Sequence, residues 1–200
     1  MNEWKIDKTL SFYQKKIILF PGRLTSWKGH EMFIESLNIF KQKNPDKLFF
    51  AIILGSDQGR KIYKKKIQRL VEQHRLVQDI LFIDNCENMP LAYKISDIVT
   101  NCSIEPEAFG RVAVEAQAMK KVIVASDIGG SRETIINNKT GFLFKAGDAV
   151  ALSDILSHIF ELNETTLKSM GNEGRKNVIN KFNVEKMCFS TYSEYKKLIA

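Results

Sequence analysis

The sequence predicts an α/β fold, with a doubly wound parallel sheet of about six strands. Short apolar runs alternate along the chain with longer amphipathic stretches that suit helices. The apolar runs are continuous, as expected for strands that helices cover on both faces. A chain of 200 residues, 44% of them hydrophobic, is long enough for one domain with a substantial core.

The first strand is expected over residues 16–20, an apolar run stopped by Pro21 and Gly22. A helix of about residues 28–43 follows, because its large apolar side chains recur on one face. The run 48–54 is the second strand, and its unbroken hydrophobicity indicates burial on both faces.

The remaining elements continue this alternation. A basic amphipathic helix is expected from about Gly59 to Arg75, and the glycine pair at 129–130 turns the chain into another helix through 136. Further strands are expected at 80–83, 98–101, 122–125 and 141–144. Further helices are expected at 90–95, in the stretch that follows Gly110 and ends near 119, and at 149–162, 164–181 and 184–199.

Candidate functional residues follow the predicted strands. Arg23 and Lys28 come after the first strand, Gly55 ends the second, and Glu107 follows the fourth. Ligands of open α/β sheets bind outside the carboxyl ends of the strands. We therefore expect all four residues at one edge of the sheet, where the two cations would neutralise phosphate and Gly55 would leave room for a ligand.

The segment 107–115 carries the most specific pattern. It places Glu107, Phe109 and Gly110 just before a helix and Glu115 inside it, about two turns along. Helix starts hold phosphates through free N–H groups and a positive dipole end. The two carboxylates could grip hydroxyls on either side of a diphosphate, so the segment favours a nucleotide sugar.

Ordinary structural roles remain open for each of these residues. Gly55 equally fits a glycine that ends a strand. Glu115 fits a helix glutamate paired with a cation, Glu107 an acid that favours the helix dipole, and Phe109 a hydrophobic anchor. A glycosidase pair fits less well, because Glu107 and Glu115 would have to flank one bond at short range. Neither a dinucleotide nor an ATP phosphate-loop motif occurs at a strand–helix junction.

Composition and net charge limit the classes of ligand and partner that this chain is expected to bind. The net charge of +7 and pI near 9.2 suit phosphorylated ligands or anionic surfaces, but the densest basic stretch, 61–69, reads best as a solvated helix face. No nucleic-acid motif accompanies it, so no nucleic acid is expected, while peripheral contact with an anionic membrane stays open. Three cysteines and three histidines in scattered positions indicate neither a disulfide framework nor a metal site. The start of the chain resembles no secretory signal, so we expect a cytoplasmic protein.

Three motifs, at 22–29, 105–119 and 138–143, resemble glycosyltransferase family 4, and the second is most similar to bacterial lipopolysaccharide-type members. The resemblance implies the C-terminal, Rossmann-like donor domain of a GT-B enzyme. It also implies retaining transfer of a hexose-type sugar from a UDP-, GDP- or ADP-sugar to a glycan or lipid-linked acceptor, with no cofactor and no essential metal.

The same resemblance assigns roles to residues. Arg23 and Lys28 would bind the diphosphate, and Glu107 the donor sugar. Backbone amides around Phe109 and Gly110 would hold sugar or phosphate, with Arg111 in the same donor-binding segment. Glu115 would bind the ribose, and Gly55 would belong to the donor site.

The N-terminal acceptor domain of the family has no counterpart in this sequence. We expect a lead-in at 1–15, a donor domain at 16–183, and a helix at 184–200 that would cross to a missing or separate N-terminal domain. The chain would then bind nucleotide sugar but be inactive in transfer alone. A non-catalytic nucleotide-sugar module, a decayed gene fragment and a basic surface-binding protein remain alternatives.

Overall fold

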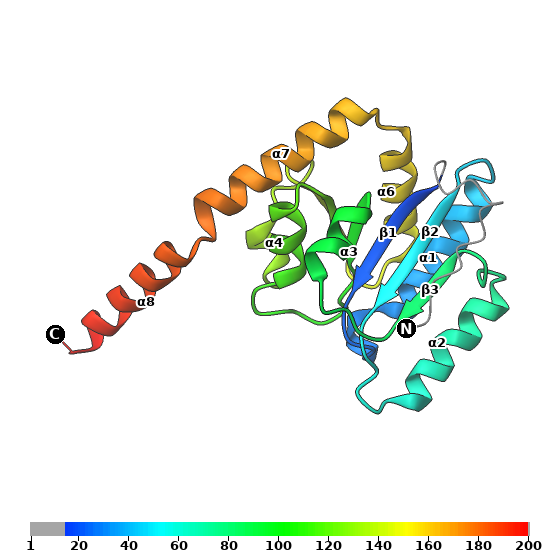
Figure 1. Ribbon diagram of the computed structural model, residues 1–200, viewed down its shortest axis with the longest axis horizontal. Helices are drawn as coiled ribbons and strands as arrows, with labels where there is room; N and C mark the ends of the chain where they lie inside the picture. Colours follow the sequence, from blue (N-terminus) through cyan, green and yellow to red (C-terminus); the bar gives the residue numbers. More distant parts are fainter. Residues whose placement is uncertain (1–14, 200) are drawn as a thin grey trace.

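A computed structural model describes residues 15–199 and shows the predicted α/β architecture. All strand pairs run parallel, in the order β3-β2-β1-β4-β5-β6, with helices packed around the sheet (Figure 1). The expected lead-in at 1–15 falls almost wholly outside the described residues. The strands are β1 (Lys16–Pro21), β2 (Phe49–Leu54), β3 (Ile80–Ile83), β4 (Ile98–Asn101), β5 (Val122–Ser126) and β6 (Phe142–Phe144).

The helices lie close to the predicted ranges. They are α1 (His30–Lys43), α2 (Lys61–Gln73), α3 (Met89–Ile95), α4 (Arg111–Ala118), α5 (Ser131–Thr134), α6 (Ala149–Glu161), α7 (Glu164–Lys181) and α8 (Val184–Ile199), with a 3-10 turn η2 (Ser26–Lys28) before α1. Several boundaries differ from the expected ranges. The helix α1 starts at His30 rather than near residue 28, and α2 spans Lys61–Gln73 rather than about 59–75, starting only after Gly59 with φ +84°. The helix α5 ends at Thr134 rather than at residue 136.

The continuous apolar strands serve two cores, because successive side chains of a strand point to opposite faces. In β1, Ile18 and Phe20 join the core under α1, α2 and α6. Leu19 joins the second core, with Ala92 of α3 and Ala113 of α4. Both faces of the sheet are therefore covered, which explains why the strands show no polar alternation.

The order of the strands reverses direction between β1 and β4. Chain connections run from β1 outward through β2 to β3 on one side, and from β4 through β5 to β6 on the other. Loops that leave β1 and β4 thus turn away from each other at the carboxyl edge, which is the usual ligand position in such sheets.

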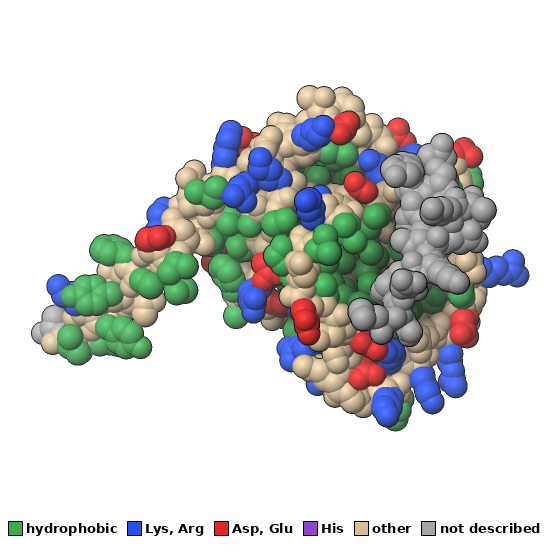
Figure 2. Space-filling view, in the orientation of Figure 1, with side chains coloured by type: hydrophobic (Ala, Val, Ile, Leu, Met, Phe, Trp, Pro, Cys, Tyr) green, Lys and Arg blue, Asp and Glu red, His purple; other side chains and the backbone are tan. Residues whose placement is uncertain are grey.

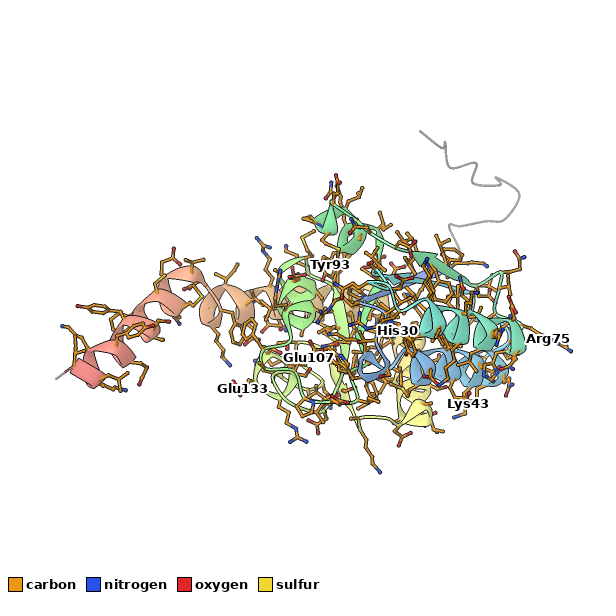
Figure 3. The ribbon with its side chains drawn as sticks, turned by 90° about the horizontal axis from the view of Figure 1, so that it is seen from below. His30, Lys43, Arg75, Tyr93, Glu107 and Glu133 are labelled. Atoms are coloured by element: carbon orange, nitrogen blue, oxygen red, sulfur yellow. The ribbon has the colours of Figure 1, made fainter. Side chains whose placement is uncertain are left out.

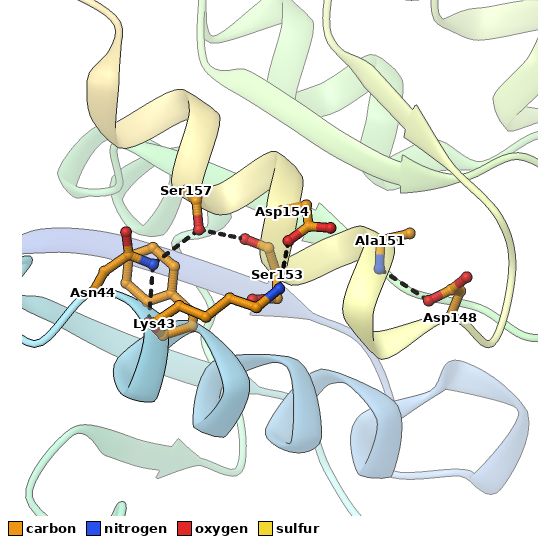
Figure 4. A network of polar contacts seen from close by, with 8 residues as sticks. Lys43, Asn44, Asp148, Ala151, Ser153, Asp154 and Ser157 are labelled. Carbon is orange, nitrogen blue, oxygen red and sulfur yellow. Dashed lines mark hydrogen bonds and ion pairs between the residues drawn. The ribbon is translucent and has the colours of Figure 1, made fainter.

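Helices α1 and α6 are joined at one end by a polar network (Figure 4). The Asn44 side-chain amide donates to Phe40 O at 3.0 Å and to Ser157 Oγ at 2.9 Å. Lys43 Nζ lies 2.7 Å from an Asp154 carboxylate oxygen. The bond to Ser157 and the ion pair with Asp154 link α6 to α1 at this end of the two helices.

The last helix, α8, stands apart from the sheet and its covering helices (Figure 1). None of its residues is buried, and it exposes large apolar side chains along its length, which Figure 2 shows as a green surface. Its apolar face is therefore exposed rather than packed on the domain. Among residues 15–199, no helix combines the length and hydrophobicity needed to cross a bilayer.

Candidate functional site

The centre of the carboxyl edge is an ion pair between Lys28 and Glu107. Lys28 Nζ lies 2.8 Å from Glu107 Oε2, and the two side chains are only 9% and 18% exposed. Lys28 ends the η2 turn after β1, and Glu107 lies in the loop after β4. The pair thus joins the loops after β1 and β4 at the switch point. The Lys28 ammonium also lies 4.5 Å from the centre of the Trp27 ring.

Glu107 is held ionised by its neighbours. Burial alone raises the pKa of its carboxyl, but hydrogen bonds from Lys28 and Ser103 more than offset burial, so the pKa lies below its usual range. Ser103 Oγ donates to Glu107 Oε1 and also lies 3.2 Å from Asn101 Oδ1. Figure 3 shows Glu107 near the middle of the molecule, together with His30 and Tyr93.

Gly129 and Gly130 pack directly against the backbone of the loop that carries Glu107. A Cβ at Gly129 would stand 2.5 Å from Glu107 O, and one at Gly130 would stand 2.5 Å from the Phe109 carbonyl carbon. Gly130 N–H donates to Glu107 O at 2.8 Å. Only backbone without side chains fits this closely, so the glycine pair works as a packing surface that fixes the position of Glu107.

The start of α4 faces the same edge. Gly110, at φ +75°, takes the left-handed conformation that glycine tolerates best, and α4 begins at the next residue without a side-chain cap. Its first N–H groups are therefore of the kind that binds anions. The helix starts directly after Gly110, as expected, and Glu115 is its fifth residue. Five residues make little more than one turn, so the expectation of two turns was wrong.

Glu115 is fixed by two neighbours. Tyr93 Oη donates to Glu115 Oε2 at 2.7 Å, and Arg111 Nη2 donates to Glu115 Oε1 at 3.0 Å. Tyr93 is buried in α3, where burial and the Glu115 carboxylate raise its pKa, so its phenol stays protonated and donates. The pairing of Glu115 with Arg111 also matches the ordinary structural reading of this glutamate.

The other candidates are placed less specifically. The Arg23 side chain is exposed and makes no hydrogen bond or ion pair within residues 15–199. Gly55 has a structural reason of its own, since a Cβ there would lie 1.9 Å from Gly22 O. Phe109 is half-exposed, and its ring packs edge-on against Phe182 with centroids 5.6 Å apart. The structure thus joins Lys28 to Glu107 and Arg111 to Glu115, but leaves Arg23 and Phe109 outside both pairs.

Sequence reasoning missed Tyr93, Asn101 and Ser103. Tyr93 lies 22 positions before Glu115, and only the packing of α3 beside α4 brings its hydroxyl to the carboxylate. Asn101 and Ser103 carried a weak signal, because polar residues directly follow the apolar start of β4 at its carboxyl end.

The site offers an ammonium, a fixed carboxylate on each side of a helix start, and a nearby exposed guanidinium. Such a set suits a ligand that carries both negative charge and hydroxyl groups. Among residues 15–199, no three His, Cys, Asp or Glu side chains gather in a way that could hold a metal ion.

Comparison with known families and curated proteins gives one consistent result. The family model of glycosyl transferases group 1 matches residues 2–177. The D-inositol 3-phosphate glycosyltransferase of Corynebacterium glutamicum is 29% identical over 155 residues, which cover 76% of this chain. The chain spans 37% of the length of that relative.

Solved structures agree with the fold. A glycosyltransferase from Rickettsia africae has a TM-score of 0.86 and 35% identity, covering 92% of this chain and 48% of its own. The C-terminal domain of the group 1 protein LpcC from Francisella tularensis has a TM-score of 0.75 and 27% identity, covering 84% and 87%. The Anabaena protein HepE, solved with UDP and glucose, has a TM-score of 0.84 at 23% identity, covering 92% and 49%.

Proposed function

The chain belongs to the glycosyl transferases group 1 family, and from this premise we propose that it is the donor-binding half of a retaining family 4 glycosyltransferase. The donor would be a nucleotide diphosphate sugar, a UDP-, GDP- or ADP-sugar. The likeness to the C-terminal domain of LpcC supports the assignment to the C-terminal half. HepE was solved with UDP and glucose, which supports a donor of this chemistry.

The observation that carries the proposal is the buried Lys28–Glu107 pair at the switch point, beside the uncapped start of α4. Breaking a sugar–phosphate bond builds negative charge on the departing diphosphate. A cation and helix amides that are already in place favour this charge most in the transition state. Glu107, kept ionised by Lys28 and Ser103, would accept from hydroxyls of the donor sugar.

The remaining residues take supporting roles in this proposal. Exposed Arg23 would fold onto the diphosphate when the donor binds. Glu115, oriented by Tyr93 and Arg111, would accept from the ribose hydroxyls. Gly55 would belong to the donor site, where the absence of a side chain lets the loop after β2 lie close to Gly22 in the loop after β1.

Residues 16–183 would form the donor domain, and 184–200 the segment that reaches an N-terminal acceptor domain on the same or a separate chain. Transfer of a hexose-type sugar to a glycan or lipid-linked acceptor, as in lipopolysaccharide assembly, would need that second domain. A place at the cytoplasmic face of the membrane fits a lipid-linked acceptor.

Calorimetric titration of the 200-residue chain with UDP, GDP and ADP tests the donor site. We expect selective binding of one nucleotide, weakened at least tenfold in Glu115→Ala and unchanged in Glu72→Ala, an exposed glutamate of α2. Equal affinity of Glu115→Ala and the unmodified chain would refute the ribose role. Restored sugar transfer on adding an N-terminal half would exclude a non-catalytic module.

A further inference from the structure

The loop that carries Glu107 lies at the surface and is held by few contacts. All of residues 105–109 except Glu107 are exposed, and Glu107 is only partly buried. Within residues 15–199, this loop takes part in one backbone–backbone hydrogen bond, from Gly130 N–H to Glu107 O at 2.8 Å. The glycine pair at 129–130 therefore supports the loop backbone on one side, and the side chains of the loop must supply further contacts.

The Phe109 side chain gives this loop a contact with the end of α7. Its ring lies edge-on against the ring of Phe182, with centroids 5.6 Å apart and an angle of 74° between the ring planes. Phe182 is the residue directly after α7, so the contact joins the loop after β4 to a helix that comes much later in the chain. Neither ring belongs to the two cores of the domain. The ring pair therefore does not fill a core, and its effect falls on the loop.

Helix α7 fixes the position of Phe182, because it packs alongside α4 (Figure 1). The side-chain amide of Asn177 in α7 is 8% exposed and donates to Gln117 Oε1 of α4 at 3.2 Å. It also donates to Thr134 O, at the end of α5, at 3.0 Å. Phe182 N–H donates to Val178 O at 2.8 Å, which continues the helical hydrogen bonding up to this residue. The Phe182 ring thus stands at the end of a helix that buried hydrogen bonds attach to the domain.

Phe109 lies between the two parts of the loop that would bind the donor. It follows Glu107 by two residues and directly precedes Gly110, after which α4 begins. A shift of Phe109 would therefore displace both the Glu107 carboxylate and the first N–H groups of α4. Binding groups that are already in place cost less to order when a ligand arrives, so a loop that is held still binds more tightly.

We propose that Phe182 is a positioning residue for the donor site. Its ring holds Phe109 in place, and through Phe109 it holds the backbone from Glu107 to the start of α4 in the geometry that binds the donor. Phe182 touches no part of the donor and acts only through Phe109. The inference rests on the proposed donor site, and it assigns to the end of α7 a part in the strength of donor binding.

A double-mutant cycle tests whether Phe182 acts through Phe109. Calorimetric titration of the chain with UDP-glucose, GDP-glucose and ADP-glucose identifies the sugar that binds most tightly, and the variants are titrated with that sugar. Phe182→Ala and Phe109→Ala should each weaken its binding about 3- to 10-fold. The double variant should lose no more affinity than Phe109→Ala alone. Phe189→Ala is the matched control, because Phe189 is 73% exposed and lines the same groove of about 670 Å³ as the two rings. It should change the affinity by less than about twofold.

The outcomes separate this inference from the proposed function. If none of the three sugars binds the unmodified chain, the donor proposal itself fails. Unchanged affinity in Phe182→Ala, with or without a lower melting temperature, would overturn the positioning role alone, and so would losses that add in the double variant. NMR relaxation of the chain without ligand gives a second measurement. The amide order parameters of residues 107–110 should fall in Phe182→Ala and not in Phe189→Ala, and equal values in both variants would also overturn the inference.

Discussion

Replacing Lys28 by Met tests the central ion pair most directly. Removing one partner of a fully buried pair costs about 3–5 kcal/mol, because the other charge is left unpaired. Glu107 keeps its bond from Ser103 and is 18% exposed, so we expect about 2 kcal/mol at pH 7. For a chain of this length, such a loss lowers the melting temperature by about 4–8 °C.

The loss of stability should depend on pH. The pKa of Glu107 is depressed in the folded chain, so its contribution is present above the unfolded value, about 4.3, and is lost as pH falls through the folded value. In Lys28→Met, burial is offset only by the hydrogen bonds with Ser103 and Asn101, so the pKa of Glu107 should rise. The stability difference between the two chains should therefore be largest near pH 7 and shrink as the pH is lowered and Glu107 becomes protonated.

Urea unfolding followed by circular dichroism between pH 4 and 8 measures this difference. Lys43→Met is the matched control, because Lys43 and Asp154 form a pair of similar length whose side chains are 45% and 61% exposed. The control should lose less than about 1 kcal/mol. The reasoning fails if Lys28→Met and Lys43→Met lose the same stability, or if the loss in Lys28→Met does not vary with pH.

Three further predictions concern the edge of the sheet and α8. Tyr93→Phe removes the 2.7 Å hydrogen bond to Glu115, so the carboxylate keeps only one of its two hydrogen-bond donors. Nucleotide affinity, measured by calorimetry, should fall about 3- to 10-fold. Gly55→Ala places a Cβ 1.9 Å from Gly22 O and should cost about 3 kcal/mol or more in urea unfolding. Deleting residues 184–200 should change the free energy of unfolding by less than about 0.5 kcal/mol, because α8 buries no residue.

Each of these predictions has a control or a contrary result. Tyr192→Phe, at an exposed site on α8, should leave nucleotide affinity unchanged. An equal loss of affinity in Tyr192→Phe would refute the claim that Tyr93 positions Glu115 for nucleotide binding. Gly147→Ala, where a Cβ meets no atom within 4 Å although φ is +79°, should cost only about 1 kcal/mol of backbone strain. A large loss of stability on deleting α8 would mean that the helix packs on the domain in solution.

The sheet could be predicted from sequence because its signal is local. Each strand is a short apolar run with a glycine, proline or polar stop, and strands alternating with helices leave a parallel sheet as the natural arrangement. The placement of Lys28 and Glu107 at one edge followed from the same rule, since both come directly after strands.

The contacts within the site could not be predicted in this way. The bond between Tyr93 and Glu115 depends on two helices packing side by side, and no spacing in the chain encodes it. The role of the glycine pair at 129–130 depends on a loop from another strand pressing on it. The start of α2 was expected at Gly59, but the left-handed backbone of this glycine lies outside the helix, which begins at Lys61.

The reversal of strand order has a consequence for how the molecule assembles. Strand β1 pairs with β2 over six positions but with β4 over two, Ile18 with Ile98 and Leu19 with Val99. The half that contains β1, β2 and β3 also leaves the ribosome before the half that contains β4, β5 and β6. We therefore expect the strands within each half to pair first, because the connections between them are short. The β1–β4 pairing, which joins the two halves over two positions, would then form last. Because Lys28 follows β1 and Glu107 follows β4, their ion pair can form only after the two halves have paired.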